Sequence, residues 1–327
     1  MEYRQFGNTD MKVSAIGFGC GATAGLLSRG DPKDKREVVA RAINLGINYF
    51  DTAPGYDATL SEAGLGQTLT ELKARPFVGT KINFGKDDRG DMVTAAMKSV
   101  EGSLKRLNID TIDLIQVHNK ISSTARPEYP GELSADEVLR EGGALEAFEK
   151  LKQQGKVRWI GFSAVGQTPA IQRIIDDGRF NTQQVYYTLL NPSGGQPVPA
   201  GFRNNDYGQI IDKGAEKGIG TLIIRPLAAG ALAGLQQLHP LAGGWSTGAW
   251  YEIDADRARV KALDFLLGEG DTWAQVAIRF ALAKKEASTV LVGFSSLDQV
   301  EEAVGCVGQP SLSHEQIEKL NHHYHAD

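Results

Sequence analysis

Four acid–base side chains stand where short apolar runs of the sequence end. They are Asp51, Tyr56, Lys81 and His118, in Tyr49-Phe-Asp-Thr-Ala-Pro-Gly-Tyr56, Phe77-Val-Gly-Thr-Lys81 and Asp113-Leu-Ile-Gln-Val-His118. A phenol beside a lysine ammonium can give a proton to a carbonyl oxygen, because the nearby cation favours the phenolate and lowers the phenol's pKa. An aspartate can hold that lysine in place, and a histidine can polarise the same oxygen. We therefore expect carbonyl chemistry with Tyr56 as the proton donor.

The apolar runs are part of an alternation of strand-like and helix-like segments along the whole chain. Such alternation is typical of βαβ units and a parallel sheet. Eight strands are predicted, at 15–19, 48–52, 76–81, 111–117, 157–163, 183–188, 220–225 and 289–294. This number favours an α/β fold with a closed (β/α)8 TIM barrel, in which catalytic residues lie at the C-terminal ends of the strands. An open, doubly wound sheet is less consistent, because the glycine-rich run from Gly17 to Gly21 lacks an acidic residue at the distance of a dinucleotide-binding fingerprint.

Helix and turn signals fit the same architecture. Helices are predicted at 33–46, 91–107, 144–154, 207–217 and 298–304, with Asp91 as an N-cap. Before the first barrel strand, the segment from Tyr3 to Ser14 has a Gly7-Asn8 turn and predicts a β-hairpin that could close the bottom of the barrel. A barrel of this kind accommodates residues 1–327 as one domain.

Most predicted strands and helices are joined by short loops. Three connections are long, at 119–142, 190–206 and 226–255. Long loops in compact domains are commonly functional, and these three follow strands on the catalytic face. The third carries Trp245, Trp250 and Tyr251. Their rings either pin the loop to the barrel rim or line the substrate pocket, and both interpretations remain open.

The composition does not point to a nucleic acid or a membrane as a partner. The net charge of −5 and pI near 5.8 give no reason to expect nucleic acid or an anionic membrane as a partner.

Cys20 and Cys306 are the only cysteines and are expected to be reduced. No signal peptide and no long apolar span is visible, which favours a cytoplasmic location. The histidines of Asn321-His-His-Tyr-His325 are expected to be in a solvated tail, and no metal site is predicted.

The chain resembles the aldo-keto reductases over almost its whole length. The most specific part is Asp51-Thr-Ala-Pro-Gly-Tyr56 followed by Ser61-Glu62 and Leu65-Gly66. By position, the resemblance implies that Asp51, Tyr56, Lys81 and His118 are the catalytic tetrad of that family. It also implies a nicotinamide dinucleotide across the barrel mouth, because none of these side chains is redox-active. Small-molecule carbonyls or alcohols are the implied substrates, and the oligomeric state is left open.

Cofactor-binding residues follow from the same resemblance. Ser163 and Gln184 would bind the carboxamide of the cofactor, and the backbone of 225–232 would hold its pyrophosphate. The matching positions are Gly21, Ser163, Gln184, Arg225, Leu227, Gly230, Gly293, Ser295, Gln299 and Glu302. The family favours NADP(H), and NAD(H) is the alternative.

Three departures from the family pattern fall on these positions. Ala164 replaces a common asparagine, Ile224 replaces a common tyrosine, and Phe294-Ser295-Ser296 has no cation for the ribose phosphate of NADP. The lost charge-assisted contact is about 1.5–3 kcal/mol. Arg225 could substitute for that cation.

Two other functions are compatible with some of these features. A cofactor-binding regulatory or interaction protein of the same fold remains an alternative, although the chain begins at the predicted hairpin without the extension that a partner surface would suggest. A Schiff-base aldolase or isomerase needs a neutral lysine. Pairing with Asp51 would instead keep Lys81 charged.

Overall fold

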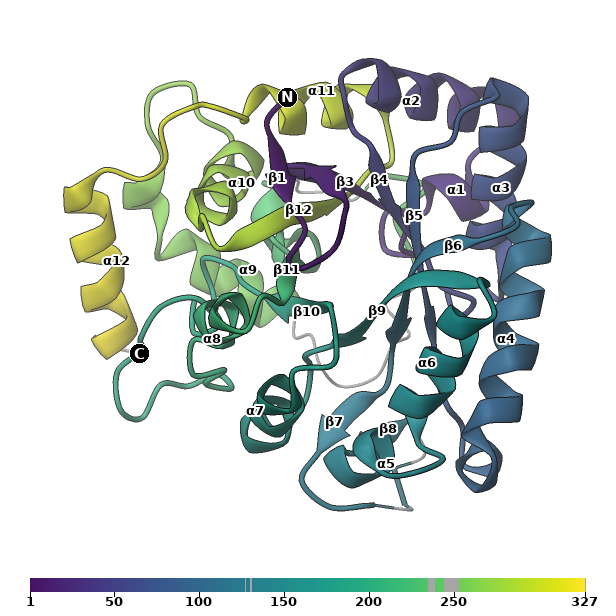
Figure 1. The fold of residues 1–327 in the computed structure, drawn as a ribbon. Coiled ribbons are helices and arrows are strands. Elements are labelled where there is room, and N and C mark those ends of the chain that lie inside the picture. Colours follow the sequence, from purple (N-terminus) through teal and green to yellow (C-terminus); the bar gives the residue numbers. More distant parts are fainter. Residues whose placement is uncertain (127, 130, 235–238, 244–252, 327) are drawn as a thin grey trace.

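Eight parallel strands close into a barrel in the computed structural model (Figure 1), which describes residues 1–126, 128–129, 131–234, 239–243 and 253–326. The strands are β3 (Ile16–Gly19), β4 (Tyr49–Asp51), β5 (Phe77–Ile82), β6 (Ile112–Val117), β9 (Val157–Ser163), β10 (Thr182–Tyr186), β11 (Gly220–Ile224) and β12 (Ala287–Gly293). Each strand pairs with the next along the chain, and β12 pairs with β3 to complete the ring. The predicted (β/α)8 barrel is therefore confirmed.

A helix follows each barrel strand and packs outside the ring (Figure 1). These helices are α2 (Pro32–Asn44), α3 (Leu60–Leu72), α4 (Met92–Leu107), α6 (Ala144–Gln153), α7 (Thr168–Asp177), α8 (Ile210–Glu216), α10 (Trp273–Ala283) and α11 (Leu297–Gly305). Asp91 caps α4 as expected, because its carboxylate accepts from the Thr94 N–H at 3.0 Å. Among the described helices, none combines the length and apolar character needed to cross a bilayer.

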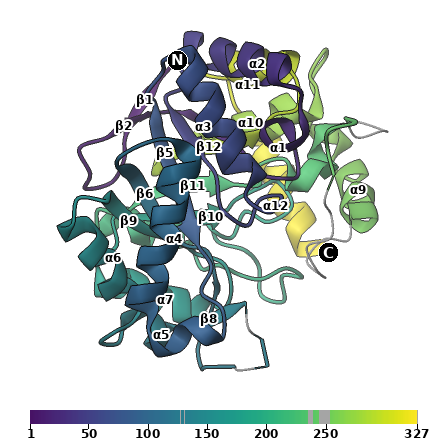
Figure 2. The same ribbon diagram turned by 90° about the vertical axis from the view of Figure 1, so that its right-hand side faces the viewer.

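The N-terminal segment forms the predicted hairpin and closes one end of the barrel. Strands β1 (Tyr3–Gln5) and β2 (Lys12–Ser14) pair antiparallel. Phe6 and Met11 between the two strands and Val13 within β2 are buried in a cluster with apolar side chains from inside the barrel, namely Tyr49, Leu114, Leu222 and Leu291. In Figure 2 the hairpin and α9 (Ile253–Lys261) lie on opposite sides of the barrel.

The long connections contain structure of their own. Residues 119–142 include a parallel pair, β7 (Lys120–Ser122) and β8 (Glu132–Ser134), and the helix α5 (Ala135–Leu139). The connection after β11 includes the short 3-10 segment η2 (Ala228–Ala233). Short helical turns also form at α1 (Leu26–Arg29), η1 (Asp87–Gly90) and η3 (Asp264–Leu266). Trp245, Trp250 and Tyr251 lie outside the described residues.

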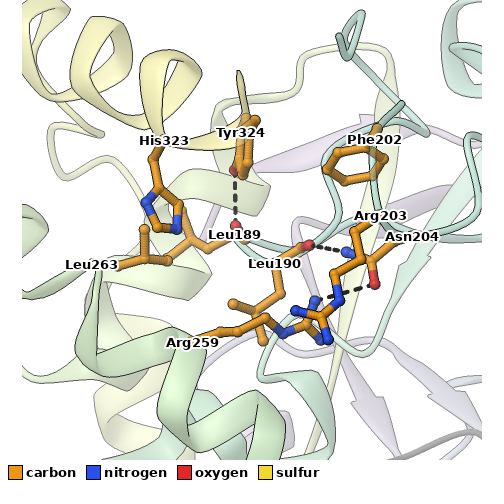
Figure 3. A pocket seen from close by; sticks show the side chains of 9 residues that line it. All are labelled: Leu189, Leu190, Phe202, Arg203, Asn204, Arg259, Leu263, His323 and Tyr324. Carbon is orange, nitrogen blue, oxygen red and sulfur yellow. Dashed lines mark hydrogen bonds between the residues drawn. The ribbon is translucent and has the colours of Figure 1, made fainter. Parts of the chain in front are cut away.

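The C-terminal end departs from the expectation of a solvated tail. Residues His314–Ala326 form α12, and the buried Tyr324 donates its hydroxyl to the Leu189 carbonyl at 2.8 Å. Figure 3 shows a pocket where Tyr324 and His323 face Arg259 and the segment after β10. Its volume is about 10 Å³, barely the space of one water molecule. It contains none of the four acid–base residues, so we interpret it as a gap in the docking of α12.

Candidate active site

Three adjacent strands bring the four acid–base residues together. In the sheet register Asp51 of β4 lies beside Gly79 of β5, and Lys81 of β5 lies beside Gln116 of β6. The Lys81 ammonium is buried and has three partners, which are the Asp51 Oδ1 atom, the Thr52 carbonyl at 2.8 Å and the Tyr56 hydroxyl at 3.1 Å. An ammonium has three N–H donors, so this arrangement uses all of them.

A tight turn after β4 positions the Tyr56 ring. The Tyr56 N–H donates to the Ala53 carbonyl at 3.1 Å. Residues 57–59 then adopt left-handed backbone angles, with φ of 47°, 50° and 78°. The Asp57 carboxylate in this turn accepts from the Ser28 hydroxyl and from Arg29, which ties the turn to α1. The phenol is therefore held by backbone geometry and by an ion pair outside the reaction site.

His118 lies against Tyr56 at the end of β6. Its backbone N–H donates to the Ile82 carbonyl at 2.8 Å. Its ring meets the Tyr56 ring edge to face, with centroids 5.7 Å apart and planes at 83°. A carbonyl oxygen placed between these two rings could accept from both.

The surroundings shift the pKa values of Tyr56, Lys81 and His118. Burial raises the pKa of Tyr56 more than the nearby Lys81 charge lowers it, so the net shift is upward. The expected net lowering by lysine is wrong for this structure, because desolvation outweighs the cation. Burial alone would lower the pKa of Lys81, but Asp51 and Tyr56 reverse this and raise it. Burial, Lys81 and Arg225 together lower the pKa of His118 to about 3, which leaves the imidazole neutral.

Asp51 has partners that the sequence analysis missed. Its second oxygen, Oδ2, accepts from the Gln184 side-chain amide at 2.8 Å, the Gln116 amide at 3.1 Å and the Tyr49 hydroxyl at 3.4 Å. A sequence signal existed for Gln116, since it is the polar residue within the apolar run Leu114-Ile-Gln-Val117. A buried amide in such a run needs a polar partner, although the sequence does not say which one.

Comparison with known proteins identifies the family of the chain. The model of the Aldo/keto reductase family matches residues 15–325. The chain belongs to the aldo/keto reductase family. It is 30% identical to a protein named L-galactose dehydrogenase from Arabidopsis thaliana, over 94% of this chain and 88% of that one.

Two further relatives bear on the function. A probable voltage-gated potassium channel subunit beta from Arabidopsis thaliana is 26% identical, over 94% of this chain and 91% of its own length. Among solved structures, the holo form of an aldo-keto reductase from Bacillus halodurans superposes with a TM-score of 0.71 at 26% identity, covering 98% of this chain and 96% of that one. Membership of this family supports an oxidoreductase, and the family generally uses NAD(P)H.

The sequence predicts a dinucleotide site at the barrel mouth that includes Ser163 and Gln184. Ser163, the last residue of β9, lies beside Gln184 in the middle of β10. The Ser163 hydroxyl oxygen is buried and has no partner among the described residues. Such an orphaned polar atom fits a site that awaits a hydrogen-bonding ligand. The Gln184 side-chain amide, in contrast, donates a hydrogen bond to the Asp51 carboxylate.

The segment after β11 gives mixed support to the predicted pyrophosphate site. Arg225 has a left-handed φ of 58°, and its guanidinium lies 5.0 Å above the Tyr186 ring. Its charge therefore acts on the tetrad side of the mouth, where it lowers the pKa of His118. Leu227 is half-buried, and its carbonyl accepts from the Gly230 N–H at 2.8 Å. That N–H is therefore already used within its own turn.

The remaining predicted cofactor residues lie after β3 and around the end of β12. The Ser295 hydroxyl donates to the Ala24 carbonyl at 2.7 Å, and its N–H donates to the Gln299 side chain at 2.8 Å. Glu302 accepts from the Thr272 hydroxyl at 2.6 Å. Gly21 has open space where a Cβ would stand, whereas a Cβ on Gly293 would lie 3.1 Å from the Ala24 Cβ. Three of these positions, Ser295, Gln299 and Glu302, therefore hold structural hydrogen bonds.

Proposed function

We propose that this protein is an NAD(P)(H)-dependent oxidoreductase that interconverts an aldehyde or ketone and an alcohol, with Tyr56 as the proton donor. One observation carries the proposal: the Tyr56 hydroxyl lies 3.1 Å from the Lys81 ammonium, which Asp51 fixes from the other side. This arrangement gives a phenol that keeps its proton at neutral pH and a cation that stabilises the phenolate once the proton has left.

The proposed mechanism places the substrate oxygen between Tyr56 and His118. The neutral His118 ring donates one hydrogen bond and polarises the carbonyl, and Tyr56 delivers its proton as charge develops on the oxygen. Lys81 remains charged throughout, because Asp51 favours its ammonium form. The bound dinucleotide would supply the hydride. In the alcohol-oxidising direction Tyr56 acts as the base.

Ser163 and Gln184 are the residues that we propose to hold the carboxamide of the dinucleotide. NADP(H) is the proposed cofactor, with NAD(H) as the alternative. The alternative is supported by the segment Phe294-Ser295-Ser296, which has no cation for the additional phosphate of NADP.

The substrate is proposed to be a small-molecule carbonyl or alcohol. Aldoses are the first class to test, because the relative at 30% identity is named L-galactose dehydrogenase. Trp245, Trp250 and Tyr251, which lie outside the described residues, are the residues that we propose to line the substrate pocket.

The experiment that tests the function is a titration of the purified protein with NADPH and NADH, followed by tryptophan fluorescence. Saturable quenching by either dinucleotide supports the site and selects the cofactor for a screen of aldehydes, ketones and aldoses in both directions. Absence of binding by both would contradict the proposal.

A second candidate is a cofactor-binding regulatory protein with little turnover, favoured by the relative named as a channel subunit. The two candidates differ in one result. Dinucleotide binding without turnover across the screen would favour the regulatory protein, whereas turnover that is lost in Tyr56→Phe would favour the enzyme.

A further inference from the structure

Gln116 is a buried amide at the centre of the site that has no part in the proposed chemistry. It lies on β6, is fully buried and is two residues before His118. Its Nε2 atom lies 3.1 Å from the Asp51 Oδ2 atom. The orientation of the amide is fixed by charge, because an amide oxygen facing a carboxylate would be repelled.

The bonds around Asp51 divide its two oxygens between two tasks. Oδ1 binds Lys81, while Oδ2 accepts the amides of Gln116 and Gln184. A carboxylate with one free oxygen can rotate about its Cβ–Cγ bond. Two amides on Oδ2 hold the carboxylate plane in the orientation that directs Oδ1 at the lysine. Hydrogen bonds to charged groups are the stronger kind, so each amide contributes appreciably to this orientation.

We propose that Gln116 is a positioning residue for the proton donor Tyr56, acting through Asp51 and Lys81. The connected path runs from the Gln116 amide to Asp51, from Asp51 to the Lys81 ammonium, and from there over 3.1 Å to the Tyr56 hydroxyl. Among the described residues the Gln116 amide donates to Asp51, so the proposed effect on Tyr56 is transmitted through this path. The inference rests on the proposed function for its catalytic consequence, although the path itself is independent of any cofactor.

Loss of the Gln116 amide should raise the pKa of Tyr56. The Lys81 charge lowers the pKa of Tyr56 against the effect of burial, which raises it. When Asp51 is held less firmly, Lys81 moves more freely and its mean effect on Tyr56 weakens. The pKa of Tyr56 then rises further, so alcohol oxidation, which needs Tyr56 as a base, shifts to higher pH.

A matched control exists on β10, which is separated from β6 by β9 in the barrel. Gln183 of β10 is also fully buried, but its amide donates to the Ile210 carbonyl at 2.8 Å and to the Thr221 hydroxyl at 3.1 Å. In both glutamines the side-chain oxygen has no partner among the described residues. Gln116→Leu and Gln183→Leu therefore remove similar buried amides, and only the first removes a bond to Asp51.

The first test follows the Lys81 ammonium by NMR in protein labelled with ¹⁵N-lysine, with Lys81→Met assigning the signal. A fully buried ammonium with three hydrogen-bond partners should exchange its protons slowly and give a visible signal in the wild type and in Gln183→Leu. We expect Gln116→Leu to broaden or lose this signal. An unchanged signal in Gln116→Leu would overturn the proposal, and this readout needs neither cofactor nor turnover.

The second test measures the pH dependence of kcat for alcohol oxidation in the same proteins. We expect Gln116→Leu to lower kcat about tenfold at neutral pH and to move the profile about one pH unit to the alkaline side, since one pKa unit is a tenfold change in the ionised fraction. KM and dinucleotide affinity should not change. A lower unfolding midpoint with an unchanged profile would mean that Gln116 is structural only. If the wild type neither binds dinucleotide nor turns over, the proposed function fails, and the ammonium signal still decides the path.

Discussion

Burial and a neighbouring cation act on the Tyr56 hydroxyl in opposite directions, and burial prevails. Tyr56 therefore holds its proton at neutral pH, as a donor in carbonyl reduction requires. We predict that Tyr56→Phe lowers kcat/KM for reduction by roughly 10²- to 10⁴-fold, which is the usual contribution of a general acid. Steady-state kinetics would measure this loss, and fluorescence titration should show unchanged dinucleotide affinity. Turnover near that of the wild type would mean that the donor is another group.

His118 links the site to stability in acid. Its folded-state pKa of about 3 lies below the ordinary value of 6.5, so the unfolded chain binds a proton in that window and the folded chain does not. Stability is therefore lost as pH falls from about 6.5 towards 3. We predict that His118→Asn, which removes this titration, unfolds in urea with a weaker dependence on pH between 6.5 and 4. Equal slopes for the two proteins would contradict the depressed pKa.

At the scale of the elements, the barrel strands and the residues at their ends could be predicted from the sequence. All eight barrel strands were predicted within a few residues, because each is an apolar run between turn or helix signals. The proximity of Asp51, Tyr56, Lys81 and His118 could be predicted because side chains at the C-terminal ends of neighbouring barrel strands converge.

What the sequence could not supply were contacts between side chains on different strands. The Asp51 partners Gln116 and Gln184 lie 65 and 133 residues away along the chain, and only barrel closure brings them together. The C-terminal helix was missed for a similar reason, since docking of Tyr324 on Leu189 stabilises a histidine-rich segment that has weak helical signals of its own.

The junction between β12 and α11 yields a test of cofactor preference. Ser295 is buried and donates to the Ala24 carbonyl, so an arginine there would break packing before it met a phosphate. Ser296, half-buried at the N-cap of α11, makes no side-chain capping bond and is the better position for a cation. We predict that Ser296→Arg raises the ratio of NADPH to NADH affinity about tenfold or more, as one charge-assisted contact implies.

Fluorescence titrations with both dinucleotides would measure that ratio. Ser295→Arg serves as the contrast, because it should lower the unfolding midpoint and leave the ratio of affinities nearly unchanged. An unaltered ratio in Ser296→Arg would indicate that the additional phosphate lies elsewhere.

On the scale of the whole molecule, the cluster that closes the barrel and the proposed active site lie at opposite ends of the barrel. The hairpin end is closed by a cluster that includes Phe6 and Tyr49, whose rings meet edge to face with centroids 5.6 Å apart. At the other end of β4, Asp51 begins the tetrad. Tyr49 contributes to both, because its hydroxyl lies 3.4 Å from the Asp51 carboxylate. Because the two ends are separate, a substitution in the hairpin turn is predicted to lower the free energy of unfolding and to leave kcat/KM unchanged.

Gly7 in the hairpin turn allows this prediction to be tested. Its φ is +57°, and an added Cβ would lie closer than 3.0 Å to three backbone atoms, the Gly220 nitrogen and the carbonyl oxygens of Gly218 and Asn181. Backbone atoms in a closed barrel cannot move aside easily, so we predict that Gly7→Ala lowers the free energy of unfolding by at least about 2 kcal/mol. Gly178 at the end of α7 has a φ of +77° with nothing within 4 Å, so Gly178→Ala isolates the backbone strain, at about 1 kcal/mol. Urea unfolding would measure both, and kcat/KM at 25 °C should match the wild type in each. Equal stability losses in the two variants would show that the hairpin turn does not depend on close packing against the barrel.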